Sequence, residues 1–118
     1  METVSDLLQI LKYGSSQART AEQLWEASGK HIALDNFKRR LRDLSSEARK
    51  TGHRVIGDNS GYYLAITEKE WKDYRNRRYA AIKDELVSLA GPEQMSVQDV
   101  IKLVYKVDVF DNNLSLNL

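Results

Sequence analysis

The chain has 118 residues, no cysteine and a formal net charge of +1. This length suits one compact domain with an appendage, and the lack of cysteine excludes disulfides, cysteine-type zinc sites and thiol nucleophiles. With 42% hydrophobic and 30% charged residues, and no apolar run long enough for a signal peptide or a membrane span, the sequence predicts a soluble, cytoplasmic protein with no membrane partner.

Two short helices are predicted at the start of the chain. Residues 3 to 13 carry apolar side chains at helical spacing, and Gly14 follows them where a left-handed residue commonly ends a helix. Thr20 and Gln23 match the capping box, which predicts a second helix from Ala21 to about Ala27.

A third and stronger helical pattern runs from Leu34 to Lys50. Apolar residues recur there at steps of three and four, which places them on one face: Leu34, Phe37, Leu41, Leu44 and Ala48. The opposite face carries Asp35, Arg39, Arg42 and Ser46, with Lys38 and Arg49 on one shoulder and Asn36 and Lys50 on the other. Asp35 is a favourable N-cap type, so we expect the helix to begin there.

Positive charge gathers around this third helix. Residues 30 to 54 carry eight basic and three acidic side chains, whereas residues 84 to 118 carry two basic and six acidic ones. Such clustering is typical of a surface that neutralises phosphate groups. The alternative for a single basic helix is a face that contacts only water.

A small β-hairpin is predicted after the third helix. Gly52 marks the helix end, and Arg54 to Gly57 and Tyr62 to Ala65 are β-prone segments separated by a polar turn. Two helices joined by a glycine-containing turn, the second of them basic, followed by a hairpin form a winged helix-turn-helix pattern. The predicted fold class is therefore mainly α with a small β-hairpin wing, followed by a C-terminal helical extension.

Residues 7 to 65 resemble the winged-helix domains of the biotin operon repressor type and small phage-encoded winged-helix proteins. The resemblance rests on Leu7, Leu8, Leu11, Thr20 to Leu24, Phe37, Leu41, Leu44, Gly52 and Gly61 to Leu64. Members of this family bind double-stranded DNA through the third helix and the wing, which implies the same role for residues 34 to 65. One departure is the stretch Ser45 to Ala48, which lengthens the third helix by about one turn and leaves the angle between helix and wing open.

The helix pattern and the resemblance together nominate DNA-binding residues. The candidates for base edges are Asp35, Asn36, Lys38, Arg39 and Arg42, because the first turns and the outward face of a recognition helix reach the bases. The candidates for phosphate contacts are Lys30, Arg40, Arg49, Lys50 and Arg54, and the wing tip adds Asn59 and Ser60.

A long helix is predicted after Ile66. Thr67 and Glu70 form a capping box, and Gly91-Pro92 is expected to end the helix near Ala90. Its apolar side suits either packing on the winged domain or a homodimer through residues 68 to 90; it carries Trp71, Tyr74, Ile82, Leu86 and Leu89.

Residues 97 to 106 carry signals for two kinds of element. Ser96 can cap a helix from Val97 to about Lys106, whereas apolar residues at alternate positions from Ile101 to Val109 suit a strand. The sequence leaves both open.

The last residues, 108 to 118, contain no Lys or Arg, and we expect a flexible acidic tail. Its end resembles the short peptide by which replication proteins dock on the bacterial sliding clamp, with Asn113 where glutamine is usual and Leu114, Leu116 and Leu118 as apolar contacts. The predicted organisation is a winged domain over residues 1 to 66, a helical extension over 67 to 107 and a tail over 108 to 118.

No catalytic or cofactor motif is present, so we expect neither an enzyme nor a cofactor. The glycines at 52, 57 and 61 match no phosphate-binding loop, and His31 and His53 alone cannot form a metal site. The leading hypothesis is sequence-specific binding of double-stranded DNA by a transcriptional regulator or a phage or replication accessory protein. The alternative is a protein–protein adaptor on a winged-helix scaffold, favoured by the modest net charge and the clamp-like ending.

Overall fold

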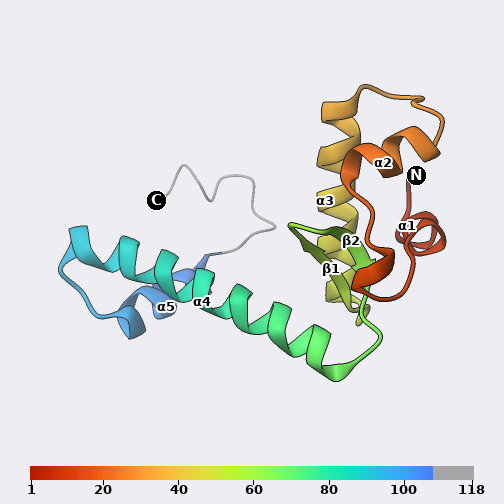
Figure 1. Cartoon of the computed structure of the whole chain (residues 1–118). Coiled ribbons are helices and arrows are strands. Elements are labelled where there is room, and N and C mark those ends of the chain that lie inside the picture. The colour runs from red at the N-terminus through yellow and green to blue at the C-terminus, as the bar shows by residue number, and fades with distance from the viewer. Residues whose placement is uncertain (108–118) are drawn as a thin grey trace. The chain divides into compact units, whose positions relative to one another are not determined.

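The computed structural model describes residues 1–107 (Figure 1). The described chain is mainly helical, with one two-stranded antiparallel hairpin between helices, which confirms the predicted fold class. The elements are α1 (Val4–Ile10), a 3₁₀ helix (Ser15–Gln17), α2 (Ala21–Ala27), α3 (Leu34–Lys50), β1 (Val55–Asp58), β2 (Gly61–Leu64), α4 (Glu68–Glu93) and α5 (Val97–Lys106). They form two compact units, Met1–Arg75 and a second that starts at Asn76, so α4 contributes to both.

The helix α1 ends earlier than predicted. It stops at Ile10, and Leu11 is extended, because the next residues pair with β2. The carbonyl of Lys12 accepts a hydrogen bond from the Leu64 amide, and the Gly14 amide donates to the Leu64 carbonyl, both at 2.8 Å. Gly14 does have a positive φ of 89°, but it precedes the 3₁₀ helix and does not cap α1.

The helix α2 has the predicted bounds and caps. The Thr20 hydroxyl accepts from the Gln23 amide, and the Gln23 side chain accepts from the Thr20 amide, which satisfies two donors that a helix start leaves unpaired. At the other end, the Gly29 amide donates to the Glu26 carbonyl and the Lys30 amide to the Trp25 carbonyl. This is a Schellman ending, with Gly29 in the left-handed conformation that it requires.

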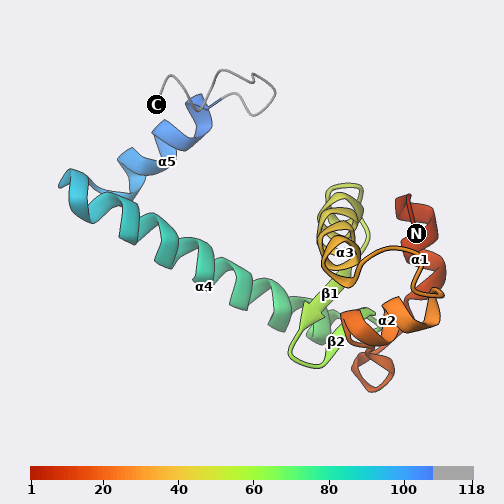
Figure 2. The ribbon, with the colours of Figure 1, turned by 90° about the horizontal axis from the view of Figure 1, so that it is seen from above.

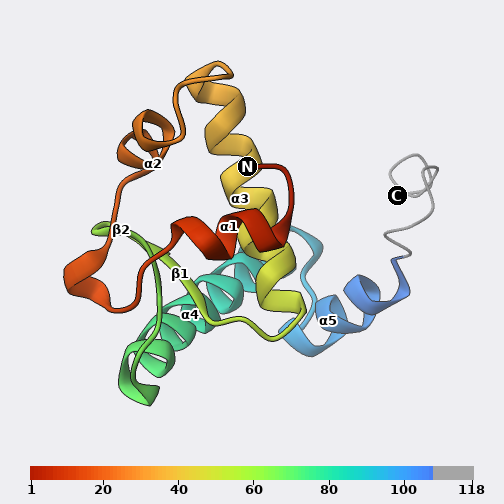
Figure 3. The same cartoon turned by 90° about the vertical axis from the view of Figure 1, so that its right-hand side faces the viewer.

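The helix α3 is the centre of the first unit, with α1 and α2 packed against it (Figures 2 and 3). Its predicted apolar face is buried at Phe37, Leu41, Leu44 and Ala48, while Leu34 is only half-buried. Removing a side chain such as Leu41 from water stabilises the fold by about 1.5 to 3 kcal/mol. The core is completed by residues of α1, α2 and the hairpin: Leu7, Leu11, Leu24, Val55 and Leu64.

The predicted start of α3 was wrong. The N-cap is Ala33, which offers no side-chain acceptor, and Asp35 lies inside the first turn. There its carboxylate still interacts favourably with the positive end of the helix dipole. The other end is as predicted: Gly52, with φ of 99°, allows the His53 amide to reach the Ala48 carbonyl.

The hairpin is covered on both faces. Val55 pairs with Leu64 and Ile56 with Tyr63, so each strand begins and ends one residue away from the predicted bounds. Alternation along the strands sends Val55 and Leu64 into the α3 core, and Ile56 and Tyr63 against Tyr74 at the start of α4. The first two turns of α4 therefore belong to the first unit.

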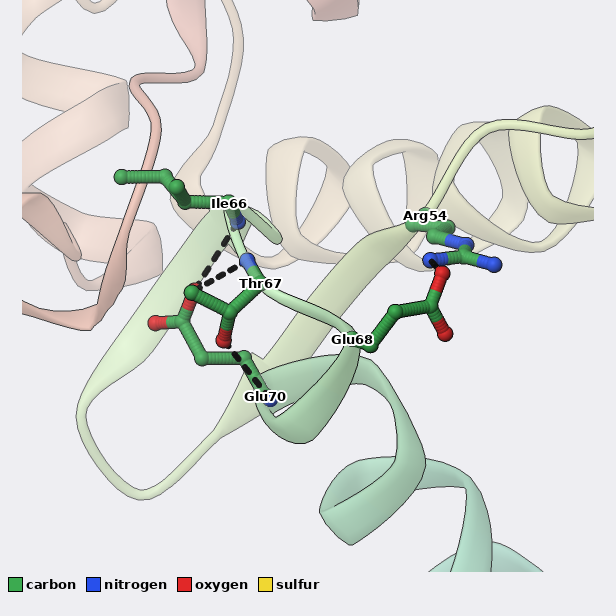
Figure 4. A network of polar contacts seen from close by, with 5 residues as sticks. All are labelled: Arg54, Ile66, Thr67, Glu68 and Glu70. Atoms are coloured by element: carbon green, nitrogen blue, oxygen red, sulfur yellow. Dashed lines mark hydrogen bonds and ion pairs between the residues drawn. The ribbon is translucent and has the colours of Figure 1, made fainter.

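The start of α4 is fixed by Glu70 (Figure 4). Its carboxylate accepts from the amides of Ile66 at 2.9 Å and Thr67 at 3.2 Å, and the Thr67 hydroxyl accepts from the Glu70 amide at 3.1 Å. The predicted capping box is confirmed. The same carboxylate accepts from the Ser15 amide at 3.0 Å, so it also ties α4 to the 3₁₀ helix.

The predicted end of α4 was wrong. The helix continues through Gly91-Pro92 to Glu93, because a proline in the last turn removes only one hydrogen bond. Gln94 takes the left-handed conformation, with φ of 52°, and the Met95 amide donates to the Ala90 carbonyl. Ser96 then caps α5, so residues 97 to 106 are a helix and not a strand.

Two further predictions concern the C-terminal tail and the membrane. The tail, with Asn113, Leu114, Leu116 and Leu118, lies outside the described residues. Within residues 1 to 107, no helix combines the length and the apolar character that crossing a membrane requires.

Candidate nucleic-acid interface

The outward face of α3 carries cations that form no hydrogen bond or ion pair with the residues that the structure describes. Arg39, Arg42 and Lys50 are exposed and Lys38 is half-exposed. Within residues 1 to 107, no hydrogen bond or ion pair joins these four side chains to another residue. Because the opposite face of α3 is the core of the unit, the helix holds these charges on a rigid support.

Asp35, Asn36 and Ser46 share this exposed face with the cations. The face therefore presents two guanidinium groups, two ammonium groups, an amide, a hydroxyl and the Asp35 carboxylate. The exposed carboxylates of Asp43 and Glu47 lie along the edge of the face that carries Asn36. Guanidinium and amide groups match the acceptors of guanine and the donor–acceptor pair of adenine, and a carboxylate can accept from the cytosine amino group.

A shallow hollow of 340 Å³ lies beside the first half of α3. Asn36, Arg39, Arg40 and Asp43 supply its polar lining, with Ile32 and Leu44 as its apolar floor. Two guanidinium groups and one amide around such a hollow suit an anionic group, and Asp43 limits how deeply one can enter.

Three of the predicted phosphate contacts are instead engaged inside the first unit. Arg40 donates to the Met1 carbonyl at 3.2 Å and lies 3.7 Å from the Glu2 carboxylate. Arg49 donates through Nε to the Val55 carbonyl at 2.7 Å. Arg54 forms an ion pair with Glu68 at 2.6 Å (Figure 4).

Aromatic rings hold two of these same arginines. The Arg49 guanidinium lies 5.3 Å from the centre of the Tyr74 ring, and the Arg54 guanidinium lies 5.9 Å from that of Trp71. Both distances allow a cation–π attraction. Arg49 and Arg54 therefore join α3 and the hairpin to α4, and their charges are partly satisfied before any ligand binds.

The pKa of Glu68 reports the same contact. The Arg54 side chain, by its hydrogen bond and then by its charge, lowers the pKa of the Glu68 carboxyl below its ordinary value. The carboxylate is fully exposed, so solvent screens the pair and its net stabilisation is small.

Lys30 occupies a different position from the other predicted phosphate contacts. It follows α2 with a left-handed backbone, and its ammonium lies 5.1 Å from the centre of the Trp25 ring. The Trp25 indole donates to the Ile32 carbonyl at 2.7 Å, which fixes the turn between α2 and α3. Lys30 remains exposed, beside the start of α3.

The hairpin tip is polar but carries no cation. Asn59 and Ser60 are exposed, and the Asp58 carboxylate accepts from the Ser60 amide at 2.8 Å and from the Tyr63 hydroxyl at 3.3 Å. An amide and a hydroxyl at the tip can bind phosphate oxygens, whereas the Asp58 charge opposes that contact.

Tyr62 of β2 lies near the cations Arg42 and Arg49 of α3, which the sequence did not reveal. Burial raises the pKa of its phenol, and the charges of Arg42 and Arg49 act in the opposite direction. Its ring rests on Gly57 of the paired strand, where an added Cβ would lie 2.9 Å from a ring carbon. The only sequence signal was a tyrosine two positions from the turn, opposite a glycine, which also fits a residue of the core.

Within residues 1 to 107, no three His, Asp or Glu side chains gather in a way that could hold a metal ion. Comparisons with protein-family models, curated proteins and solved structures gave no match for this chain.

Proposed function

We propose that the first unit binds double-stranded DNA, with the outward face of α3 in the major groove. The observation that carries the proposal is the set of unpaired cations on a rigid helix, Lys38, Arg39, Arg42 and Lys50. An α-helix fits the width of the major groove, and positive side chains on its outward face gain affinity by releasing the counterions of the phosphates.

The contacts divide by chemistry. Asp35, Asn36, Arg39 and Arg42 are suited to base edges, while Lys38, Lys50 and Lys30 are suited to phosphates. Asn59 and Ser60 at the hairpin tip supply weaker polar contacts. Arg40, Arg49 and Arg54 act through the fold, by holding the N-terminal residues, the hairpin and α4 in place around α3.

The biological setting of this binding rests on the resemblance of residues 7 to 65 to winged-helix proteins. It favours a transcriptional regulator or a phage or replication accessory protein.

A gel-shift titration of duplex fragments from the source genome, repeated across salt concentrations, tests the proposal. Binding through about three phosphate contacts predicts that the logarithm of the association constant falls with the logarithm of salt concentration, with a slope of roughly −3. No shift of any duplex at low salt would contradict the proposal and favour the protein–protein adaptor instead.

A further inference from the structure

The second unit leaves apolar surface uncovered. Ile82, Leu89, Leu103 and Val104 are each about half exposed, and Tyr105 is 85% exposed. By contrast, Ala90 of α4 and Val100 of α5 are buried. Large apolar patches at a protein surface often mark sites of interaction.

Three of these side chains, Ile82, Val104 and Tyr105, line a groove between α4 and α5. It has a volume of 240 Å³, and its lining is almost wholly apolar: Ile82, Leu86, Ile101, Val104 and Tyr105. Figure 2 shows that α5 turns away from α4 after their short connection, so the two helices form an open wedge. A wedge of this size can receive a few apolar side chains from another helix.

The apolar residues of α4 therefore fall into two groups. Trp71 and Tyr74 at the start of α4 pack against the hairpin of the first unit. Ile82 and Leu86, further along, face the groove together with α5. Of the residues predicted for a homodimer through residues 68 to 90, Ile82 and Leu86 are therefore more accessible to a partner than Trp71 and Tyr74 are.

The charges beside the groove indicate which partner fits it. On α4, Lys83 and Glu85 lie on opposite shoulders of the stripe that carries Ile82 and Leu86, and Asp84 and Glu93 add further anions; α5 carries Asp99, Lys102 and Lys106. Glu85 lies one helical turn from Ile82, and Lys102 lies one turn from Tyr105, so an anion borders the groove on α4 and a cation borders it on α5.

A surface with both signs in this arrangement is complementary to itself. In a two-fold dimer the same patch is used twice, so α5 of one copy can lie against α4 of the other. That arrangement sets Lys102 of each copy near Glu85 of its partner and so pairs opposite charges.

We propose that the α4–α5 groove is the surface through which two copies of this chain associate, with α5 of each copy against α4 of the other. The proposal goes beyond DNA binding and does not depend on it, because every residue involved lies in the second unit.

Sedimentation equilibrium of the full chain, with charge-reversal variants at exposed positions, tests this association. The unmodified chain should be a dimer at micromolar concentrations, and Glu85→Lys or Lys102→Glu alone should raise the dimer dissociation constant by at least about tenfold, because each variant sets like charges together twice. An equal mixture of the two variants should form dimers again, since both contacts then join opposite charges.

The controls separate association from folding. Glu26→Lys makes the same charge change on an exposed site of the first unit and should leave the dimer intact. Circular dichroism should show unchanged helix content in every variant. A monomeric unmodified chain, variants that associate normally, or a mixture that stays monomeric would each overturn the proposal.

Discussion

Neighbouring side chains of the same type have different roles in this protein. Arg39 is exposed and unpaired within the described residues, whereas Arg40 binds the Met1 carbonyl and the Glu2 carboxylate. The sequence could not separate them, because both are basic and both lie off the apolar face of one helix. The distinction depends on a carbonyl that the tertiary fold brings from 39 residues away.

The Ser45 hydroxyl is the most unusual polar group of α3. Ser45 is 1% exposed, and its hydroxyl has no hydrogen-bond partner in residues 1 to 107. A buried hydroxyl without a partner costs about 1 to 3 kcal/mol, and alanine also has the higher helix propensity. We expect Ser45→Ala to raise the free energy of unfolding by about 1 kcal/mol in urea titrations.

Ser46, the adjacent residue, provides the matched control, because it is exposed. Ser46→Ala should gain only the difference in helix propensity, a few tenths of a kcal/mol. If Ser45→Ala were less stable than the unmodified chain, the Ser45 hydroxyl would not be an unsatisfied buried group.

At the scale of helices and strands, starts were more predictable than ends. Thr20, Thr67 and Ser96 cap their helices through contacts only three residues away, so the sequence alone identifies them. The end of α1 depends on pairing of Lys12 with β2, and the end of α4 depends on a left-handed glutamine. Neither cause is visible in a local pattern.

The Glu70 cap should make stability depend on pH. Hydrogen bonds from the amides of Ile66 and then Ser15 hold the pKa of the Glu70 carboxyl below its ordinary value. A carboxyl with a lowered pKa in the folded state stabilises the fold above the ordinary glutamate pKa of about 4.3, and this contribution is lost as pH falls through the folded pKa.

Thermal unfolding across pH 3 to 7 of Glu70→Gln measures this contribution. We expect the variant to melt below the unmodified chain near pH 7 and the two melting temperatures to converge toward acid pH, where Glu70 is protonated. Glu26→Gln removes a similar charge from an exposed position of α2 and should show no such convergence. A constant difference between Glu70→Gln and the unmodified chain would mean that charge is irrelevant to this cap.

At the scale of the whole molecule, the sequence predicted the fold class and the apolar face of α3. Both follow from hydrophobic periodicity, which local sequence records directly. The two covered faces of the hairpin could not be predicted, since they require Tyr74 and Trp71 to reach Ile56 and Tyr63 across the first unit. The groove between α4 and α5 could not be predicted either, because Pro92 indicated that α4 ends earlier than it does.

The two units present different surfaces. In the first unit, the outward face of α3 carries exposed cations on a helix whose other face is the core. In the second unit, an apolar groove lies between α4 and α5. If DNA binding and self-association occur on these separate surfaces, substitutions on one should leave the other property unchanged.

The proposed contact between the outward face of α3 and DNA bases is tested most directly by fluorescence anisotropy of a labelled duplex that the unmodified chain has selected. Arg39→Ala and Arg42→Ala should each weaken binding to that duplex by on the order of 1 to 3 kcal/mol and reduce discrimination against unrelated duplexes, because a bidentate contact to guanine is lost. Lys83→Ala, which removes one charge from an exposed site of α4, should bind normally. Unchanged affinity of both arginine variants for the selected duplex at low salt would contradict the claim.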